Sequence, residues 1–308
     1  MRIDPRARAL ALPLVLLCAC ADATGGDATG SNSAEIARQP LPIVLLHGAA
    51  GFDQIGPLEY YYRVADTLED DSQIVFATEV DPLQLIDVRA AELAEQLDAI
   101  LAATGAPRVH LIAHSQGGLD ARFLISQLGY GDRIATLTSI STPHHGSRVA
   151  DVGLGLVPGP VEDVLGFLID FVIGGVVGSE QDVIGQLYQL TEDYAVNEFN
   201  PANPDDPRVA YYSVAGVTQA NPIHNPFTKD LVDPLLLVPY FILAPTGAND
   251  GLVTVQSSRH GTFLGTIPAD HLDEVGQLLG STALGFGHRG FYRALARFLT
   301  DPAAPSPI

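Results

Sequence analysis

Five short apolar runs, separated by amphipathic stretches, dominate the chain between residues 42 and 216. They read PIVLLHG (42–48), QIVFATEV (73–80), RVHLIAH (108–114), IATLTSIS (134–141) and RVAYYSVAG (208–216). Nearly continuous, β-branched-rich runs are typical of strands buried on both faces of a parallel sheet. After the second run, apolar residues recur at helical spacing and stop before Gly105 and Pro107. The alternation predicts a mostly parallel, doubly wound α/β sheet that binds ligands at the carboxyl ends of its strands.

The charge balance excludes one class of partner. The chain has 308 residues, of which 47% are hydrophobic, so it can bury a sizeable core in one large domain or two small ones. Sixteen Lys and Arg against 36 Asp and Glu give a net charge of −20. Such a field repels phosphate backbones and anionic lipid headgroups, so we expect no nucleic acid partner.

The first twenty residues have the pattern of an export signal. Arg2, Arg6 and Arg8 precede ALALPLVLLCAC, an apolar segment too short to remain as a membrane-spanning helix. Both cysteines of the chain lie in this segment, so an exported protein of this kind folds without an internal disulfide. We therefore expect a cell-envelope or secreted protein.

The end of that segment offers two processing routes. LCAC at 17–20 resembles a bacterial lipobox, in which Cys20 is acylated and becomes the mature N-terminus, while cleavage after Ala21 or Ala23 would release the protein. Residues 21–39 are small, polar and glycine-rich, which predicts a flexible linker. The folded domain is expected at 40–300, with a short tail at 301–308.

LIAHSQGGLD, residues 111–120, places a lone serine between an apolar run and the start of a helix near Gly117. Ser115 there matches the nucleophile elbow, a sharp strand-to-helix turn that lifts a hydroxyl above the sheet. The usual pattern is G-x-S-x-G, but Ala113 occupies the first small position. The alternative is a serine that caps an ordinary helix.

A nucleophilic serine needs a base and an orienting acid, which in this fold follow in the order Ser, Asp or Glu, His. GANDGLV offers Asp250 in a turn, and ADHLDEV offers His271. Five other histidines compete for the role of base, and spacing alone does not exclude them: His144, His145, His224, His260 and His288. His288 is the strongest rival, although its place at the start of a final helix also suits a capping or surface histidine.

An oxyanion hole needs two backbone N–H groups. One comes from the residue after the nucleophile, Gln116, and one from the loop after an earlier strand. LLHGAAGFD at 45–53 supplies such a loop, with Ala49 as the donor. A glycine-rich turn that merely closes a strand is the alternative reading.

Five segments in order resemble the true lipases of the Pseudomonas and Burkholderia type, within the α/β hydrolases. They are PIVLLHGAAGFDQI, HLIAHSQGGLDARFL, TSISTPHHGS, TGANDGLV and DHLDEVGQLLG. The resemblance covers most of residues 40–300. It implies an α/β hydrolase domain with Ser115 as nucleophile, Asp250 as acid, His271 as base, and Ala49 and Gln116 as oxyanion donors. It also implies a dedicated foldase for some members.

The same resemblance implies one structural calcium ion, held by Asp233, Asp273 and the carbonyls of Gln277 and Ser281. Calcium prefers oxygen ligands, and an ion at Asp273 would fix the loop that carries His271. Without the resemblance, Asp273 would be read as part of a solvated acidic turn. Gln256 stands where the family often has a cysteine of a disulfide, which leaves more of the bracing to the metal.

Residues 161–178, VEDVLGFLIDFVIGGVVG, form an insertion with an apolar stripe at helical spacing. Glycines and prolines flank it, which favours a lid at about 150–190 over a plain core helix.

The sequence therefore predicts an exported serine esterase that hydrolyses acylglycerols through an acyl-enzyme. The alternatives are another carboxylesterase or polyester depolymerase on the same fold, or a non-catalytic binding module.

Overall fold

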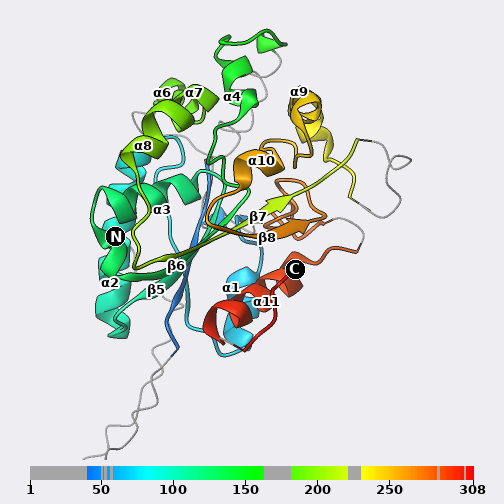
Figure 1. Cartoon of the computed structure of the whole chain (residues 1–308). Coiled ribbons are helices and arrows are strands. Elements are labelled where there is room, and N and C mark those ends of the chain that lie inside the picture. The colour runs from blue at the N-terminus through cyan, green and yellow to red at the C-terminus, as the bar shows by residue number, and fades with distance from the viewer. Residues whose placement is uncertain are drawn as a thin grey trace, which may run out of the picture. The chain divides into compact units, whose positions relative to one another are not determined.

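A six-stranded sheet with the order β4-β1-β5-β6-β7-β8, parallel throughout, forms the centre of the domain (Figure 1). The computed structural model describes residues 40–49, 51, 54–55, 58–162, 182–220, 230–282, 285–301 and 303–308. All of these belong to one compact unit, Gln39–Ile308. The predicted export signal, Cys20, the predicted linker and His224 lie outside the described residues.

The predicted strands and fold class are confirmed. Each of the five apolar runs contains a strand of the sheet, and a sixth strand was not anticipated. The strands are β1 (Ile43–Leu46), β4 (Val75–Ala77), β5 (Val109–His114), β6 (Ile134–Ile140), β7 (Ala210–Gly216) and β8 (Thr262–Ile267), with a separate antiparallel pair β2 (Gln54–Ile55) and β3 (Leu58–Glu59). β8 is one of the two edge strands, and most of its residues are only partly buried or exposed, which explains why it lacks the continuous apolar signal.

Helices cover both faces of the sheet. The α-helices are α1 (Val64–Asp70), α2 (Ile86–Thr104), α3 (Gly117–Ser126), α4 (Arg148–Gly153), α6 (Val183–Gln189), α7 (Glu192–Tyr194), α8 (Asn200–Ala202), α9 (Leu237–Leu243), α10 (Val255–Ser258) and α11 (His288–Thr300). Shorter turns are η1 (Tyr130–Asp132), η2 (Ala195–Phe199), η3 (Pro234–Leu236) and η4 (Ala244–Thr246). The helix predicted before Gly105 is α2, which ends as Gly105 adopts a φ of 65°.

Alternate side chains of each buried strand enter different cores. In β1, Ile43 and Leu45 pack with α1 and α11, whereas Val44 and Leu46 pack with α2 and α3. Figure 1 shows these two helix pairs on opposite sides of the sheet. A strand buried on both faces needs apolar residues at every position, which is the reason the strands read as continuous runs.

The predicted lid falls only partly within the described residues. α4 and the first turn after Pro160 precede residues 163–181, which are not described, and α6 follows them. Among the described residues, no helix is long and apolar enough to span a bilayer.

Candidate active site

Ser115 lies in the sharp turn that joins β5 to α3. Its φ is 55°, in the left-handed region that non-glycine residues rarely adopt, and its backbone N–H donates to the Ile140 carbonyl at 2.9 Å. Between Val109 and Arg122, every residue except Ser115 is buried. Gln116, not Ser115, precedes the first residue of α3, so the structure does not support the helix-capping reading. The strained turn thus exposes one hydroxyl at the carboxyl end of the sheet.

Small residues around the serine permit the close approach of neighbouring segments. A β-carbon at Gly117 would lie 2.7 Å from the His47 carbonyl oxygen, and one at Gly118 would lie 2.1 Å from Thr142 Oγ1. The extra methyl at Ala113 is accommodated because that residue points into the core formed by β1, α2 and α3, where it is fully buried. The departure from G-x-S-x-G therefore does not crowd the turn.

The predicted acid and base form a buried pair. His271 Nδ1 lies 2.7 Å from Asp250 Oδ2, and the two side chains are almost completely buried. The other carboxylate oxygen of Asp250 accepts from the N–H groups of Leu252 and Val253, and the Asp250 carbonyl accepts from the His271 N–H at 2.9 Å. The carboxylate and the imidazole are held in one orientation, with Nε2 left available for proton transfer.

The competing histidines have other partners. His144 Nε2 bonds to Ser139 Oγ at 2.8 Å, and its ring stacks on that of His260, which pairs with Asp205. His145 Nδ1 lies 3.3 Å from the Ser257 carbonyl oxygen. His288 begins α11 as expected, but it is buried, and its Nε2 lies 2.9 Å from the Tyr62 carbonyl oxygen.

Ser115 and His271 open onto one pocket. Ala49 also lines it, and the remaining wall is mostly apolar: Pro143, Val149, Ala150, Val183, Leu187, Leu190, Leu252 and Val253. Most of these side chains come from α4, α6 with its C-cap Leu190, and the Asp250 turn, while Pro143 lies in the loop after β6. An apolar cavity beside a nucleophile suits an acyl chain.

Arg89 holds the loop that carries Ala49. This fully buried guanidinium pairs with Asp120 at 2.8 Å and donates to the carbonyls of His47 and Gly48 at 3.0 and 3.2 Å. Because a trans peptide points its C=O and N–H in opposite directions, a Gly48 carbonyl bound to Arg89 turns the Ala49 N–H the other way. The other proposed donor residue, Gln116, is buried, and its side-chain oxygen accepts from Gln186 of α6 at 2.9 Å.

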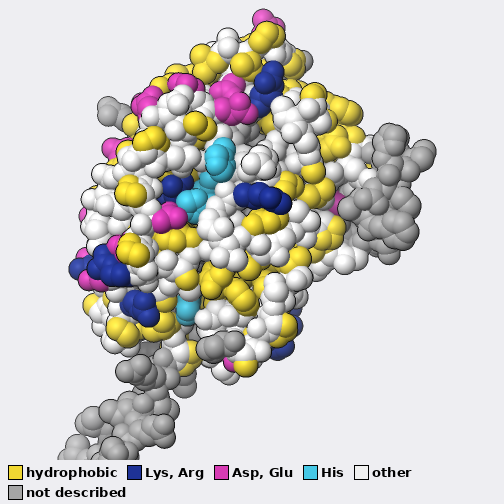
Figure 2. Space-filling model, viewed as in Figure 1, with side chains coloured by type: hydrophobic (Ala, Val, Ile, Leu, Met, Phe, Trp, Pro, Cys, Tyr) yellow, Lys and Arg dark blue, Asp and Glu magenta, His cyan; other side chains and the backbone are white. Residues whose placement is uncertain are grey.

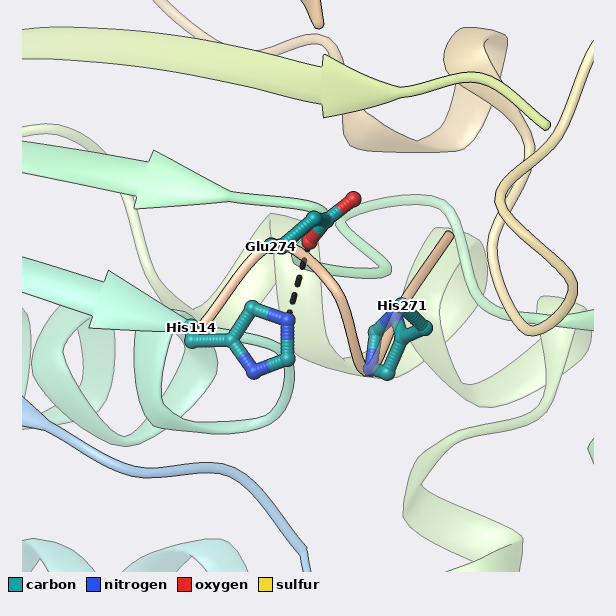
Figure 3. Close-up of side chains that lie close together, drawn as sticks. All are labelled: His114, His271 and Glu274. Atoms are coloured by element: carbon teal, nitrogen blue, oxygen red, sulfur yellow. Dashed lines mark hydrogen bonds and ion pairs between the residues drawn. The ribbon is translucent and has the colours of Figure 1, made fainter. Parts of the chain in front are cut away.

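A buried pair, His114 and Glu274, lies next to His271, the predicted base (Figure 3). His114 Nε2 lies 2.9 Å from Glu274 Oε2, and the rings of His114 and His271 are 4.4 Å apart. Glu274 also accepts from Ser141 Oγ at 2.6 Å. Burial and, next, the charge of Asp250 raise the pKa of Glu274 well above its usual range, and burial lowers the pKa of His114. Both effects favour neutral forms.

Three carboxylates gather behind His271. They belong to Asp230, Asp270 and Asp273, with one oxygen of each within 4.8 Å of the others. Asp233 lies beside this cluster: its N–H donates to Asp270 at 2.7 Å, while its own carboxylate accepts from the Leu235 N–H. The structure thus groups the predicted Asp273 with Asp230 and Asp270, and Asp233 contacts Asp270 through its backbone N–H.

The carboxylates of Asp270 and Asp230 differ in their hydrogen bonding. Asp270 accepts from three backbone N–H groups, those of Asp233, Leu272 and Asp273. Asp230 is 1% exposed, and within the described residues neither of its carboxylate oxygens has a hydrogen-bond partner. Burial, with a contribution from Asp270, raises its pKa to about 6. Gln277, whose carbonyl was predicted as a ligand, lines the pocket, and that carbonyl accepts from the Leu279 N–H.

Several residues of the site carried no usable sequence signal. Arg89 sits on a helix face where arginine is ordinarily solvated, and Asp230 follows no recognisable motif. His114 and Glu274 flank residues that were singled out, yet their pairing across 160 positions is not encoded locally.

Comparison with known proteins identifies the family. Residues 42–167 match the α/β hydrolase fold family. A triacylglycerol lipase of Vibrio cholerae is 32% identical over 79% of this chain and 82% of its own length, and one of Burkholderia plantarii is 28% identical over 91% of each. The chain belongs to the bacterial triacylglycerol lipase family. The crystal structure of the mature Bacillus licheniformis lipase BlEst2 has the same fold, with a TM-score of 0.63 at 20% identity over 85% of this chain and 92% of that one.

Membership of this family fixes the class of chemistry. This lipase homologue is an ester hydrolase built on the α/β hydrolase fold, as the resemblance predicted.

Proposed function

We propose that this lipase homologue is exported and hydrolyses acylglycerols, with Ser115, His271 and Asp250 as its catalytic triad. One observation supports the proposal above the others: the strained serine and the histidine paired with Asp250 line the same apolar pocket. A non-catalytic module would have no use for a strained serine in one pocket with a buried Asp–His pair.

The geometry supports acyl transfer in two steps. His271 Nε2 accepts the Ser115 proton as Oγ attacks the ester carbonyl carbon, and the N–H groups of Ala49 and Gln116 stabilise the resulting oxyanion. The tetrahedral intermediate collapses, His271 protonates the departing alkoxide, and the acyl group remains on Ser115. Water, deprotonated by His271, then attacks this acyl-enzyme, and His271 returns the proton to Ser115 as the acyl bond breaks and the fatty acid is released. Asp250 orients His271 and stabilises its charged form throughout.

The surface near the pocket suits an apolar substrate. Large apolar side chains of the η3–α9 segment are exposed: Leu235 55%, Leu237 40%, Val238 41% and Phe241 58%. Figure 2 shows apolar side chains gathered on the side where Figure 1 places α9. Leu243 of α9 packs with Val149, which lines the pocket. An aggregated lipid would thus find apolar surface beside the cavity.

The test is the substitution Ser115→Ala with unchanged folding. Turnover of p-nitrophenyl esters and emulsified triglyceride should fall by several orders of magnitude, and an organophosphonate should label Ser115 in the wild type. Labelling at another serine, or retained turnover, would show that Ser115 is not the nucleophile. The ratio of rates on triglyceride and short-chain esters separates a lipase from a carboxylesterase or polyester depolymerase.

We also propose a structural calcium ion at Asp230 and Asp273. The donor set is all oxygen, and the buried, unpartnered carboxylate of Asp230 is a group that a cation would satisfy. Asp270 organises the same turn through its backbone contacts, and Asp233 remains adjacent. Calcium would neutralise these carboxylates and tie the His271 loop to the segment at Asp230.

We also propose that Cys20 is acylated and anchors the protein, and that folding needs a lipase foldase. Mass spectrometry of the mature protein should find a lipidated N-terminus at Cys20 if the lipobox is used. An unmodified N-terminus at Asp22 or Thr24 would make the protein a released one. Expression with and without a lipase foldase, compared by yield of active enzyme, tests the second point.

A further inference from the structure

Tyr60 joins the oxyanion loop to the residue before the nucleophile. Its hydroxyl accepts from the Gly48 N–H at 3.0 Å and lies 2.6 Å from His114 Nδ1. The side chain is 3% exposed and also lines the pocket beside Ser115. The Tyr60 hydroxyl therefore contacts both the backbone of the oxyanion loop and the imidazole of His114.

The position of Gly48 relative to the serine is tightly constrained. A β-carbon on Gly48 would lie 2.6 Å from Ser115 Cβ and 2.9 Å from the Tyr60 hydroxyl. The loop therefore passes directly over the nucleophile, and Tyr60 is packed against the same point. Any rotation of Gly48 would move the next N–H, that of Ala49, relative to Ser115.

Two contacts together fix the backbone around Gly48. Arg89 holds the Gly48 carbonyl, which sets the peptide plane that carries the Ala49 N–H. Tyr60 holds the Gly48 N–H, which sets the preceding plane. Beyond His114, the chain of hydrogen bonds continues to Glu274, three residues after the base, and through Ser141 to the Gly216 N–H.

We propose that Tyr60 is a positioning residue that preorganises the oxyanion hole, and that it does so by linking the Gly48 N–H to the His114–Glu274 pair. The inference rests on the proposed function, because it assigns Ala49 as an oxyanion donor. An oxyanion hole is effective when its donors are already oriented for the transition state, so a looser loop costs rate rather than substrate binding.

The test is Tyr60→Phe with Tyr61→Phe as matched control. Tyr61 is the neighbouring buried tyrosine, and its hydroxyl donates to the Leu46 carbonyl at 2.7 Å instead of contacting Gly48. We expect Tyr60→Phe to lower kcat on p-nitrophenyl butyrate roughly 10- to 100-fold, somewhat less than the loss of a whole oxyanion donor, with KM within about twofold. Tyr61→Phe should leave both constants within about threefold of wild type.

A second readout separates positioning from general destabilisation. Phenylboronic acid adds to the serine and places an oxygen in the oxyanion hole, whereas hexanol only fills the apolar pocket. Tyr60→Phe should weaken boronate inhibition by the same factor as kcat and leave hexanol inhibition unchanged. Unchanged kcat and boronate inhibition in a folded Tyr60→Phe enzyme would overturn the inference, as would a rise in KM alone.

If Tyr60→Phe does not fold, the wild type still provides a test. In a sample labelled with ¹⁵N-glycine, the Gly48 amide should exchange slowly with solvent before any inhibitor is bound. Rapid exchange that slows only after phosphonate labelling would show that Tyr60 does not hold the loop. Failure of the phosphonate to label Ser115 at all would instead reject the proposed function, so the two failures are distinguishable.

Discussion

At the scale of single residues, hydrogen-bond partners distinguish between histidines that are chemically equivalent candidates for the general base. Both His271 and His288 are buried, and spacing in the sequence favours neither strongly. Asp250 bonds one nitrogen of His271 and leaves the other facing the pocket, whereas His288 Nε2 meets the Tyr62 carbonyl. A general base needs an available nitrogen on the side of the nucleophile, and His271 lines the same pocket as Ser115, whereas His288 is not among the residues that line it.

This contrast predicts different consequences for two alanine substitutions. His271→Ala should abolish ester turnover, because it removes the imidazole proposed to take the Ser115 proton. His288→Ala should destabilise the fold by emptying a packed site next to Gly276, yet keep most of the turnover per folded molecule. The measurement is kcat per folded molecule, with the folded fraction taken from thermal unfolding. A folded His288→Ala enzyme without activity would show that His288, and not His271, is the base.

At the scale of elements, glycine positions decide how closely helix and strand pack. Gly117 begins α3 against the end of β1, and a β-carbon there would contact the His47 carbonyl. Gly290 lies in the first turn of α11, exposed and with nothing within 4 Å of such a β-carbon. The same substitution should therefore have opposite effects at the two sites.

Gly117→Ala should destabilise the domain by about 1–3 kcal/mol through overpacking, and it should lower kcat because it displaces the oxyanion loop. Gly290→Ala should stabilise the domain by about 0.5–1 kcal/mol through its helix propensity and leave kcat unchanged. Denaturant unfolding of both variants gives the comparison. Equal effects on stability would show that close packing at the elbow is not what requires glycine.

The contact between α4 and α7 predicts a dependence of stability on pH. Burial and, next, the charge of Glu192 raise the pKa of Asp151 to about 6, and its carboxylate accepts from the Glu192 N–H. The folded state thus keeps a proton that the unfolded state loses nearer pH 4. The stabilisation that Asp151 contributes to the folded state is fully present below about pH 4, and it is lost as the pH rises through about 6.

Asp151→Asn removes the charge and keeps an acceptor. The melting temperature of Asp151→Asn should rise relative to that of the wild type as the pH increases from 4 to 6.5. Above pH 6.5 the difference between the two should stay constant. Asp70→Asn, at an exposed position at the end of α1, serves as the control and should follow the wild type. A pH-independent difference between Asp151→Asn and wild type would contradict the assignment.

At the scale of the whole molecule, the large negative net charge means that a bound cation should affect the stability of the fold. The net charge of −20 and the cluster at Asp230, Asp270 and Asp273 both disfavour the compact state without a counterion. A ligand that binds only the folded state stabilises it by about 2.7 kcal/mol at a hundredfold excess over its Kd. We therefore expect calcium to raise the melting temperature and exhaustive chelation to lower it.

Two asparagine variants locate the ligands. Asp230→Asn should raise the melting temperature in chelator, because it removes a buried unpartnered charge, and it should lose the response to calcium. Asp233→Asn should keep most of that response, since its carboxylate caps a turn beside the cluster. Calorimetric titration checks the binding directly. A wild type that is insensitive to chelation, with metal analysis showing none bound, would reject the site.

The sequence by itself determined the features that depend on local chemistry. Five strands, the helix α2 and the elbow at Ser115 were predictable because side-chain periodicity and turn residues act over a few positions. The order of Asp250 and His271 was readable, but the choice of His271 over its rivals leaned on family resemblance. β8 was missed because its burial is incomplete.

Only the tertiary structure decided which distant groups share an environment. Asp230 joins Asp270 and Asp273 across some forty positions, Tyr60 meets His114 across 54, and Arg89 reaches back 42 to the oxyanion loop. None of these pairs has a fixed spacing or a periodic pattern, because the sheet order that brings them together is set by long-range packing. A buried polar group must find a partner within about 3 Å, and the identity of that partner depends on the whole fold rather than on the neighbouring sequence.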